Sequence, residues 1–177
     1  MKIAVLGGGR VGSALPDRWR EAGHDLAVSS RETVADIAAG AHGVLLAVPA
    51  TAAADVLAQA GPLDATVLVD ATNNLSSGSD AAEIAHLAGT MPAVKAFNTV
   101  FAQFFAEPPA SPARLVLAGE DTGAKTVVAA LARDAGFEPI DAGGTDSVPL
   151  LEAFARLVIG IAYRQGRSPF VYRFEAS

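Results

Sequence analysis

The sequence contains no cysteine, and this absence removes several kinds of chemistry. Disulfide bonds, cysteine-ligated metal centres and thiol catalysis are excluded, and a chain without thiols fits a cytoplasmic location. Basic residues are also scarce, because 13 Lys and Arg stand against 19 Asp and Glu and give a net charge of −6. A nucleic-acid partner requires a basic surface, so we expect none. No apolar run reaches the roughly 18 residues of a transmembrane helix, so we expect no membrane partner.

A cluster of catalytic side chains is also lacking. The three histidines, His24, His42 and His86, are far apart in the sequence. No Glu/His or Asp/His spacing is typical of a metal site, and no G-x-S-x-G nucleophile turn is present. We therefore assign no catalytic residue and no metal ligand from the sequence, and we look for residues that bind a small-molecule substrate or cofactor.

Short apolar runs alternate with helical stretches along the whole chain. Most of these runs are continuously apolar, as expected for strands of a parallel sheet that is covered on both faces. This pattern predicts an α/β fold, a Rossmann-type, doubly wound, mostly parallel sheet with a small C-terminal helical addition. We expect a single domain over 1–177, with 113–177 as a possible small C-terminal lobe. The predicted strands are Lys2–Leu6, Asp25–Ser29, Gly43–Val48, Thr66–Asp70, Ala93–Phe97, Arg114–Ala118 and Phe137–Asp141.

The last predicted helix runs from Ser147 to about Gln165 and carries one broad apolar face. Two interpretations of this face remain open. It either packs against the sheet as part of the core or forms the surface of a homodimer, because a single apolar stripe fits both. The residues of the face are Leu150, Leu151, Phe154, Leu157, Val158 and Ile161.

A glycine-rich turn follows the first predicted strand. Gly7, Gly9 and Gly12 have the spacing G-x-G-x-x-G, and Arg10 and Val11 complete the turn at the start of a helix. In dinucleotide-binding proteins the first glycine permits a tight turn, the second lets the backbone approach the pyrophosphate, and the third lets helix and strand pack closely. We predict a dinucleotide site here, against the alternative of a purely structural turn. Pro16 falls inside the helix, so we expect a kink or a later helix start.

The end of the second predicted strand indicates which dinucleotide is bound. A site for NAD places Asp or Glu there to hold the ribose 2′-hydroxyl, whereas this chain has Ser29, Ser30 and Arg31. A hydroxyl and a guanidinium suit a 2′-phosphate, so Ser30 and Arg31 predict NADP. The alternative is Glu32, which a shift of one residue would bring to the strand tip.

Longer stretches resemble a known family. Val94–Val100 closely resembles a hallmark of the NADP oxidoreductases that depend on the deazaflavin coenzyme F-420, and of the NADPH-flavin reductase domain of six-transmembrane ferric reductases. Val69–Leu75 is similar to the second group, and Ser30-Arg31 matches the 2′-phosphate contact of both. Leu117–Asp121 and Pro139–Gly143 extend the similarity towards the C-terminus.

The resemblance implies an arrangement of the site. NADPH would lie across the carboxyl ends of the strands, where open α/β sheets bind ligands. The nicotinamide side would be lined by Ala47, Val48, Pro49, Ala71, Thr72 and Asn73. The acceptor ring would face Phe97, Asn98, Thr99 and Val100.

From these residues we expect an NADP-dependent oxidoreductase that transfers a hydride between NADPH and a deazaflavin or flavin acceptor, namely coenzyme F-420, FMN or FAD. Such a transfer needs two stacked rings and no strong acid or base, in keeping with the missing catalytic cluster. A basic path for an anionic acceptor tail would come from Lys95, Arg164, Arg167 and Arg173. The alternative is a non-enzymatic NADP(H)-binding sensor module.

Overall fold

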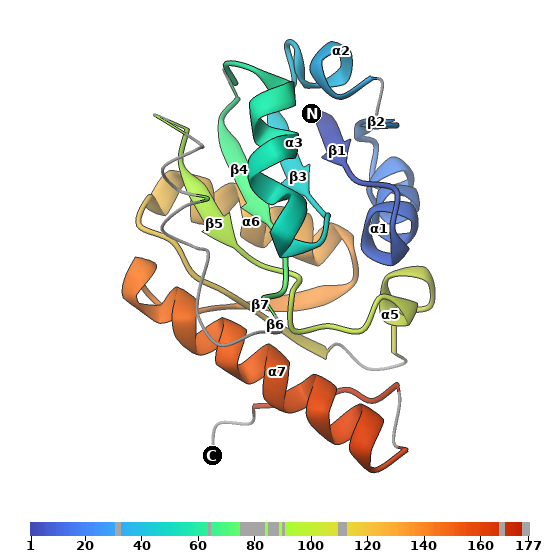
Figure 1. Cartoon of the computed structure of the whole chain (residues 1–177). Helices are drawn as coiled ribbons and strands as arrows, with labels where there is room; N and C mark the ends of the chain where they lie inside the picture. Colours follow the sequence, from blue (N-terminus) through green and yellow to red (C-terminus); the bar gives the residue numbers. More distant parts are fainter. Residues whose placement is uncertain are drawn as a thin grey trace.

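A five-stranded parallel sheet forms the centre of the protein, with the strand order β2-β1-β3-β4-β5 (Figure 1). The structure is a computed structural model that describes residues 1–30, 33–63, 65–74, 84, 89, 91–109, 113–166 and 169–174. Because β1 lies between β2 and β3, the winding direction reverses at the β1/β3 boundary, as in doubly wound folds. The five strands are β1 (Lys2–Leu6), β2 (Asp25–Val28), β3 (Gly43–Leu46), β4 (Val67–Asp70) and β5 (Ala93–Lys95).

Two further strands extend this sheet. β6 (Ala113–Leu117) and β7 (Phe137–Asp141) pair in parallel with each other. An antiparallel bridge between Lys95 and Ala118 joins β5 to the end of β6, with N–O distances of 2.8 and 3.0 Å. All seven predicted strands are therefore present, and the predicted mostly parallel, Rossmann-type α/β fold is confirmed.

Helices cover both faces of the sheet. Alternate residues of β1 enter two separate core clusters, with Ile3 and Val5 in one and Ala4 and Leu6 in the other. The first cluster lies under α1 (Arg10–Glu21), α5 (Gln103–Ala106) and α6 (Thr122–Asp134), and the second lies under α2 (Val34–Ala38) and α3 (Ala53–Ala60). Burial on both faces is the reason why these strands are continuously apolar.

The first helix starts earlier than Pro16 suggests. α1 begins at Arg10, directly after the glycine turn, and continues through the buried Pro16 to Glu21. The expected later start is therefore wrong. An interior proline costs a helix about 3 kcal/mol, and the packing of α1 offsets this cost. Trp19 is fully buried, and its indole N–H donates to the carbonyl oxygen of Leu131 on α6 at 2.8 Å.

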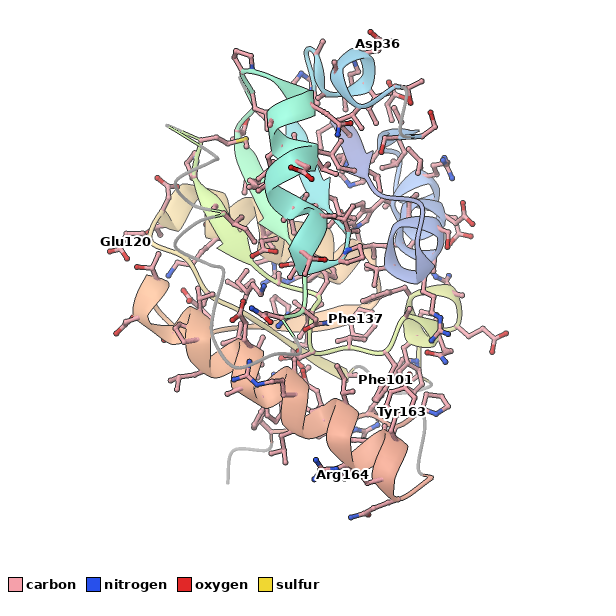
Figure 2. The ribbon with its side chains drawn as sticks, in the orientation of Figure 1. Asp36, Phe101, Glu120, Phe137, Tyr163 and Arg164 are labelled. Atoms are coloured by element: carbon pink, nitrogen blue, oxygen red, sulfur yellow. The ribbon has the colours of Figure 1, made fainter. Side chains whose placement is uncertain are left out.

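The last helix, α7 (Val148–Arg164), divides its apolar residues between two surfaces. Leu151 packs with Val116 and Ala118 in a third core cluster, beside β6 and β7 in Figure 1. Val158 is also buried on α7. An outward stripe is formed by Leu150 and Leu157, which lie two helical turns apart and are 67 and 59% exposed. Tyr163, which is 71% exposed, lies near the end of the helix (Figure 2).

Both interpretations of the apolar face thus keep some support. The packing residues make α7 part of the core, and the homodimer stays a prediction that the outward stripe would serve. Light scattering of the purified protein tests the homodimer, and a monomer at all concentrations would contradict it.

No helix within the described ranges is long and apolar enough to span a membrane.

Candidate functional site

Of the three glycines of the G-x-G-x-x-G motif, packing requires two, Gly7 and Gly12, and does not require Gly9. Gly7 has a φ of +115°, and a Cβ there would lie 2.5 Å from the carbonyl oxygen of Ala47. A Cβ at Gly12 would lie 1.8 Å from the carbonyl oxygen of Gly7, so α1 can approach β1 only because this residue has no side chain. No atom lies within 4 Å of a Cβ built at Gly9, which is the N-cap of α1. The turn therefore leaves open space beside Gly9, where the first N–H groups of the helix have no helical partner.

A cleft of about 770 Å³ opens from this turn. It lies at the carboxyl ends of β1, β2 and β3 and is bounded on its outer side by α3. Ser29 stands at the end of β2, and its hydroxyl oxygen accepts a hydrogen bond from the N–H of Gly7 at 3.1 Å. The lining residues are Gly7, Gly8, Gly9, Ser29, Ser30, Val34, Ala47, Val48, Pro49, Ala52, Asp55, Val56 and Gln59.

The cleft brings together part of the predicted cofactor site. Among the residues predicted to bind the dinucleotide, Gly7, Gly9, Ser30, Ala47, Val48 and Pro49 line it. Arg10 and Val11 form the first turn of α1, and Gly12 is buried beneath it. Arg31 and its alternative Glu32 lie outside the described residues. The sequence did not predict Asp55, Val56 and Gln59 of α3 as lining residues, because no sequence motif marks which face of a helix lines a cleft.

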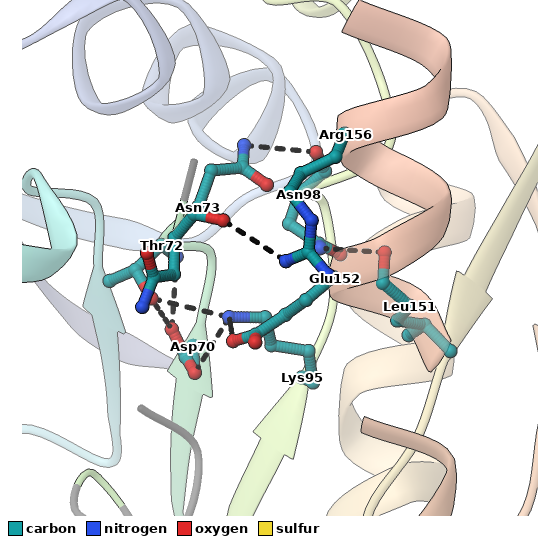
Figure 3. Close-up of polar contacts among 9 residues, drawn as sticks. Asp70, Thr72, Asn73, Lys95, Asn98, Leu151, Glu152 and Arg156 are labelled. Atoms are coloured by element: carbon teal, nitrogen blue, oxygen red, sulfur yellow. Dashed lines mark hydrogen bonds and ion pairs between the residues drawn. The ribbon is translucent and has the colours of Figure 1, made fainter. Parts of the chain in front are cut away.

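A buried polar network occupies the carboxyl ends of β4 and β5 (Figure 3). The ammonium of Lys95 lies 3.1 Å from a carboxylate oxygen of Asp70, 3.2 Å from one of Glu152 and 3.2 Å from the hydroxyl oxygen of Thr72. The second oxygen of Asp70 accepts from the N–H and the hydroxyl of Thr72, at 2.9 and 2.7 Å. None of the four residues is more than 3% exposed.

This network joins α7 to the edge of the sheet. Asp70 and Lys95 end two neighbouring strands, whereas Glu152 comes from α7, 57 residues beyond Lys95. The expectation that Lys95 belongs to a basic path for an acceptor is wrong, because its ammonium is buried and paired with two carboxylates. Sequence reasoning missed the network, since no local spacing connects its members.

Two asparagines lie beside the network. The side-chain N–H₂ of Asn73 donates to the backbone carbonyl of Asn98 at 3.0 Å, and that of Asn98 donates to the carbonyl of Leu151 at 3.5 Å. These bonds fix the direction of both amides, because a carbonyl oxygen can only accept. Among the residues that the structure describes, no hydrogen-bond donor reaches the buried side-chain oxygens of Asn73 and Asn98 or one carboxylate oxygen of Glu152. Such orphaned acceptors cost free energy, and here they gather in one place.

The segment predicted to face the acceptor is more buried than expected. Phe97 has a φ of +65°, which turns its ring into the core, where its centroid lies 5.7 Å from that of Trp19 and 5.9 Å from that of Phe105. Its side chain is fully buried, so Phe97 does not offer a ring for stacking and that expectation is corrected. Asn98 and Thr99 are also buried, and Val100 is partly exposed.

The chain after α7 returns to this segment. The hydroxyl oxygens of Thr99 and Tyr172 lie 2.5 Å apart. Burial raises the pKa of Tyr172 to about 12, so its phenol keeps its proton at neutral pH. The aromatic rings of Phe101 and Phe170 are 5.4 Å apart next to this pair. The C-terminal segment thus covers one side of the residues that follow β5.

Comparison with known proteins supports the fold. No family model and no curated protein matches the sequence. A proposed F-420-dependent NADP reductase from Arthrobacter sp. FB24 is similar over 99% of this chain and 100% of its own, with 24% identity and a TM-score of 0.88. A hypothetical protein from Sinorhizobium meliloti is 27% identical over 84% of this chain and 88% of its own, with a TM-score of 0.70. A reductive aminase from Aspergillus terreus in complex with NADPH has a TM-score of 0.73 at 18% identity, over 93% of this chain and 62% of its own. The resemblance inferred from the sequence is confirmed at the level of the fold.

The buried network leads to a prediction about stability. Replacing Lys95 with Met leaves two buried carboxylates without their cation, so we expect the free energy of unfolding to fall by about 3–5 kcal/mol. Lys125→Met is the matched control, because Lys125 pairs at 2.8 Å with an Asp141 carboxylate that is 52% exposed. We expect a loss of about 1 kcal/mol or less there. Urea denaturation measures both, and equal losses in the two variants would contradict the role given to Lys95.

Proposed function

We propose that this chain is an NADP-dependent oxidoreductase that transfers a hydride between NADPH and a planar deazaflavin or flavin acceptor. One observation carries the proposal. The glycine turn after β1, with open space beside Gly9, leads into a cleft at the point where the winding of the sheet reverses. Doubly wound sheets bind their nucleotides in this crevice.

The residues present fit a dinucleotide along the whole edge of the sheet. The pyrophosphate would lie against Gly8, Gly9 and Arg10, at the positive end of the α1 dipole. The adenosine half would occupy the cleft between β2 and α3, and the nicotinamide half would lie over the ends of β3, β4 and β5. There the orphaned oxygens of Asn73 and Asn98 would accept from N–H groups, which the nicotinamide carboxamide provides. A bound dinucleotide would thus donate hydrogen bonds to these two oxygens and remove the free-energy cost of leaving them unpaired.

The chemistry of the site also fits this reaction. When bound, NADPH supplies the hydride, and the protein has to hold two rings in contact and keep water away. Val48 and Val100 provide apolar surface for this purpose, and Ala47, Pro49, Ala71 and Thr72 complete the nicotinamide side. α7 closes that side, since Glu152 holds it against the strand ends.

The similar structures favour an enzyme over a sensor. The Arthrobacter protein is a proposed F-420-dependent NADP reductase, and the Aspergillus protein is a reductive aminase in complex with NADPH. Among acceptors we place coenzyme F-420 ahead of FMN and FAD, because Val94–Val100 resembles a hallmark of the F-420-dependent NADP oxidoreductases and the Arthrobacter protein is a proposed enzyme of that kind. We place the acceptor beside Asn98, Thr99 and Val100.

The first prediction concerns the glycine turn. Gly9→Val has room for its side chain, so we expect a stable fold, but the methyl groups would stand where the pyrophosphate contacts the backbone. Calorimetric titration with NADPH should show severely weakened binding. Gly160→Val on α7 is the control, since a side chain there also meets no atom within 4 Å and Gly160 does not line the cleft. A normal affinity of folded Gly9→Val for NADPH would show that the cofactor does not bind at this turn.

The second prediction concerns the choice of cofactor, which we attribute to Ser30 and Arg31. Losing a charge-assisted bond to the 2′-phosphate costs about 1.5–3 kcal/mol, so Arg31→Ala should weaken NADPH binding by about tenfold or more. Binding of NADH should hardly change, because NADH has no 2′-phosphate. Glu32→Ala serves as the control and should affect neither nucleotide. If Arg31→Ala weakens both nucleotides equally, the assignment of the 2′-phosphate is wrong.

The third prediction concerns the acceptor. Stopped-flow mixing with coenzyme F-420, FMN and FAD in turn should show NADPH oxidation, fastest with coenzyme F-420. In Val100→Trp the larger side chain should fill the space in which we place the acceptor. NADPH oxidation should then slow at least tenfold, while the affinity for NADPH stays normal. Absence of turnover with all three acceptors would favour the sensor. Unchanged turnover in Val100→Trp would place the acceptor elsewhere.

A further inference from the structure

Arg156 lies on α7 at the edge of the candidate site, next to the residues that follow β4. It follows Glu152 by one helical turn on α7 and is partly buried. One guanidinium nitrogen donates to the backbone carbonyl of Asn74, four residues after the end of β4, at 3.3 Å. Figure 3 shows Arg156 on α7 above Glu152. A guanidinium has five N–H donors, and this bond uses one of them.

No carboxylate neutralises this cation within the described part of the chain. Glu152 lies four residues away, at the usual spacing for a helical ion pair, but its one bonded oxygen faces Lys95 and its other oxygen has no hydrogen bond. Elsewhere Arg18, Arg20 and Arg114 each pair with an acidic residue. A partly buried cation without a counter-ion loses hydration without compensation, so its position requires a reason.

We infer that Arg156 binds an anionic substituent of the hydride acceptor, a phosphate or carboxylate attached to the acceptor ring system. This inference rests on the proposed function and adds the residue that binds the anionic tail of the acceptor. Arg156 takes the place of Lys95, which is buried and paired, in the path expected for such a tail. Arg binds phosphate and carboxylate through a planar fork of donors.

The position of Arg156 favours the acceptor over the dinucleotide as its ligand. The phosphate turn follows β1, and Asn74 follows β4, which lies two strands away across β3. Neighbouring strands are about 4.8 Å apart, so about 10 Å separates the two strand ends. The nearer part of the dinucleotide is the nicotinamide, which becomes positively charged when it gives up its hydride and therefore does not attract a guanidinium.

The test compares two ligands that differ only by one phosphate group. FMN and riboflavin share one ring system, and FMN adds a phosphate at the end of its ribityl chain. Flavin fluorescence is titrated with wild-type protein, Arg156→Met and Arg133→Met, each saturated with NADP. Arg133 is the control because it is exposed near the end of another helix, α6, and does not line the cleft. The same comparison is made with coenzyme F-420 and its uncharged ribityl core.

We expect the wild type to bind the anionic ligand of a pair about tenfold or more tightly than the neutral one. Arg156→Met should lose this preference and leave the affinity for the neutral ligand and for NADPH unchanged, whereas Arg133→Met should keep it. A preference that survives in Arg156→Met, weaker NADPH binding in that variant, or no binding of any of the four ligands would overturn the inference.

NADPH oxidation is measured in the same samples to separate this inference from the proposed function. Anion-selective binding that depends on Arg156 but is not followed by NADPH oxidation supports the inference and contradicts the oxidoreductase. Oxidation of NADPH without any preference for the anionic ligand supports the oxidoreductase and contradicts the role of Arg156.

Discussion

Lys95 is the residue on which the arrangement of this molecule depends. Its backbone forms the antiparallel bridge that joins β6 to the parallel sheet, and its ammonium holds the carboxylates of Asp70 and Glu152 in the interior. Because buried charges are tolerated only when they are paired, the three residues have to stay together. The pairing therefore fixes α7 across the carboxyl ends of β4 and β5, so that a helix borders the edge of the sheet at which we place the dinucleotide.

The position of α7 gives the two halves of this edge of the sheet different properties. On the side of β1 and β2 the cleft is lined by glycine backbone and serine hydroxyls, which suit phosphate groups, whereas α3 lines its outer side with Asp55, Val56 and Gln59. On the side of β4 and β5 the polar atoms are buried, and three acceptor oxygens have no donor. A dinucleotide that crosses the edge at β1 would place its phosphates in the first region and its carboxamide in the second. The division supports the proposed orientation of NADPH, with the acceptor between the nicotinamide and α7.

The sequence predicted the features that depend on local patterns. Continuous apolar runs located all seven strands, and the spacing of Gly7, Gly9 and Gly12 located the turn. Features that depend on contacts between distant residues could not be predicted. The ion pair of Lys95 with Glu152 spans 57 residues, and the burial of Phe97 depends on Trp19 and Phe105. The glycine turn also located the start of α1 at Arg10, and the later start suggested by Pro16 was wrong because tertiary packing outweighed the local cost of the proline.

The most direct test of this account is a crystal structure of the protein with NADPH bound. The account predicts that the pyrophosphate contacts the backbone beside Gly9 and that the carboxamide lies within hydrogen-bonding distance of the side-chain oxygen of Asn73 or Asn98. It also predicts that α7 keeps its place, with Glu152 still paired with Lys95. A nicotinamide bound outside α7, or a dinucleotide that avoids the glycine turn, would contradict it.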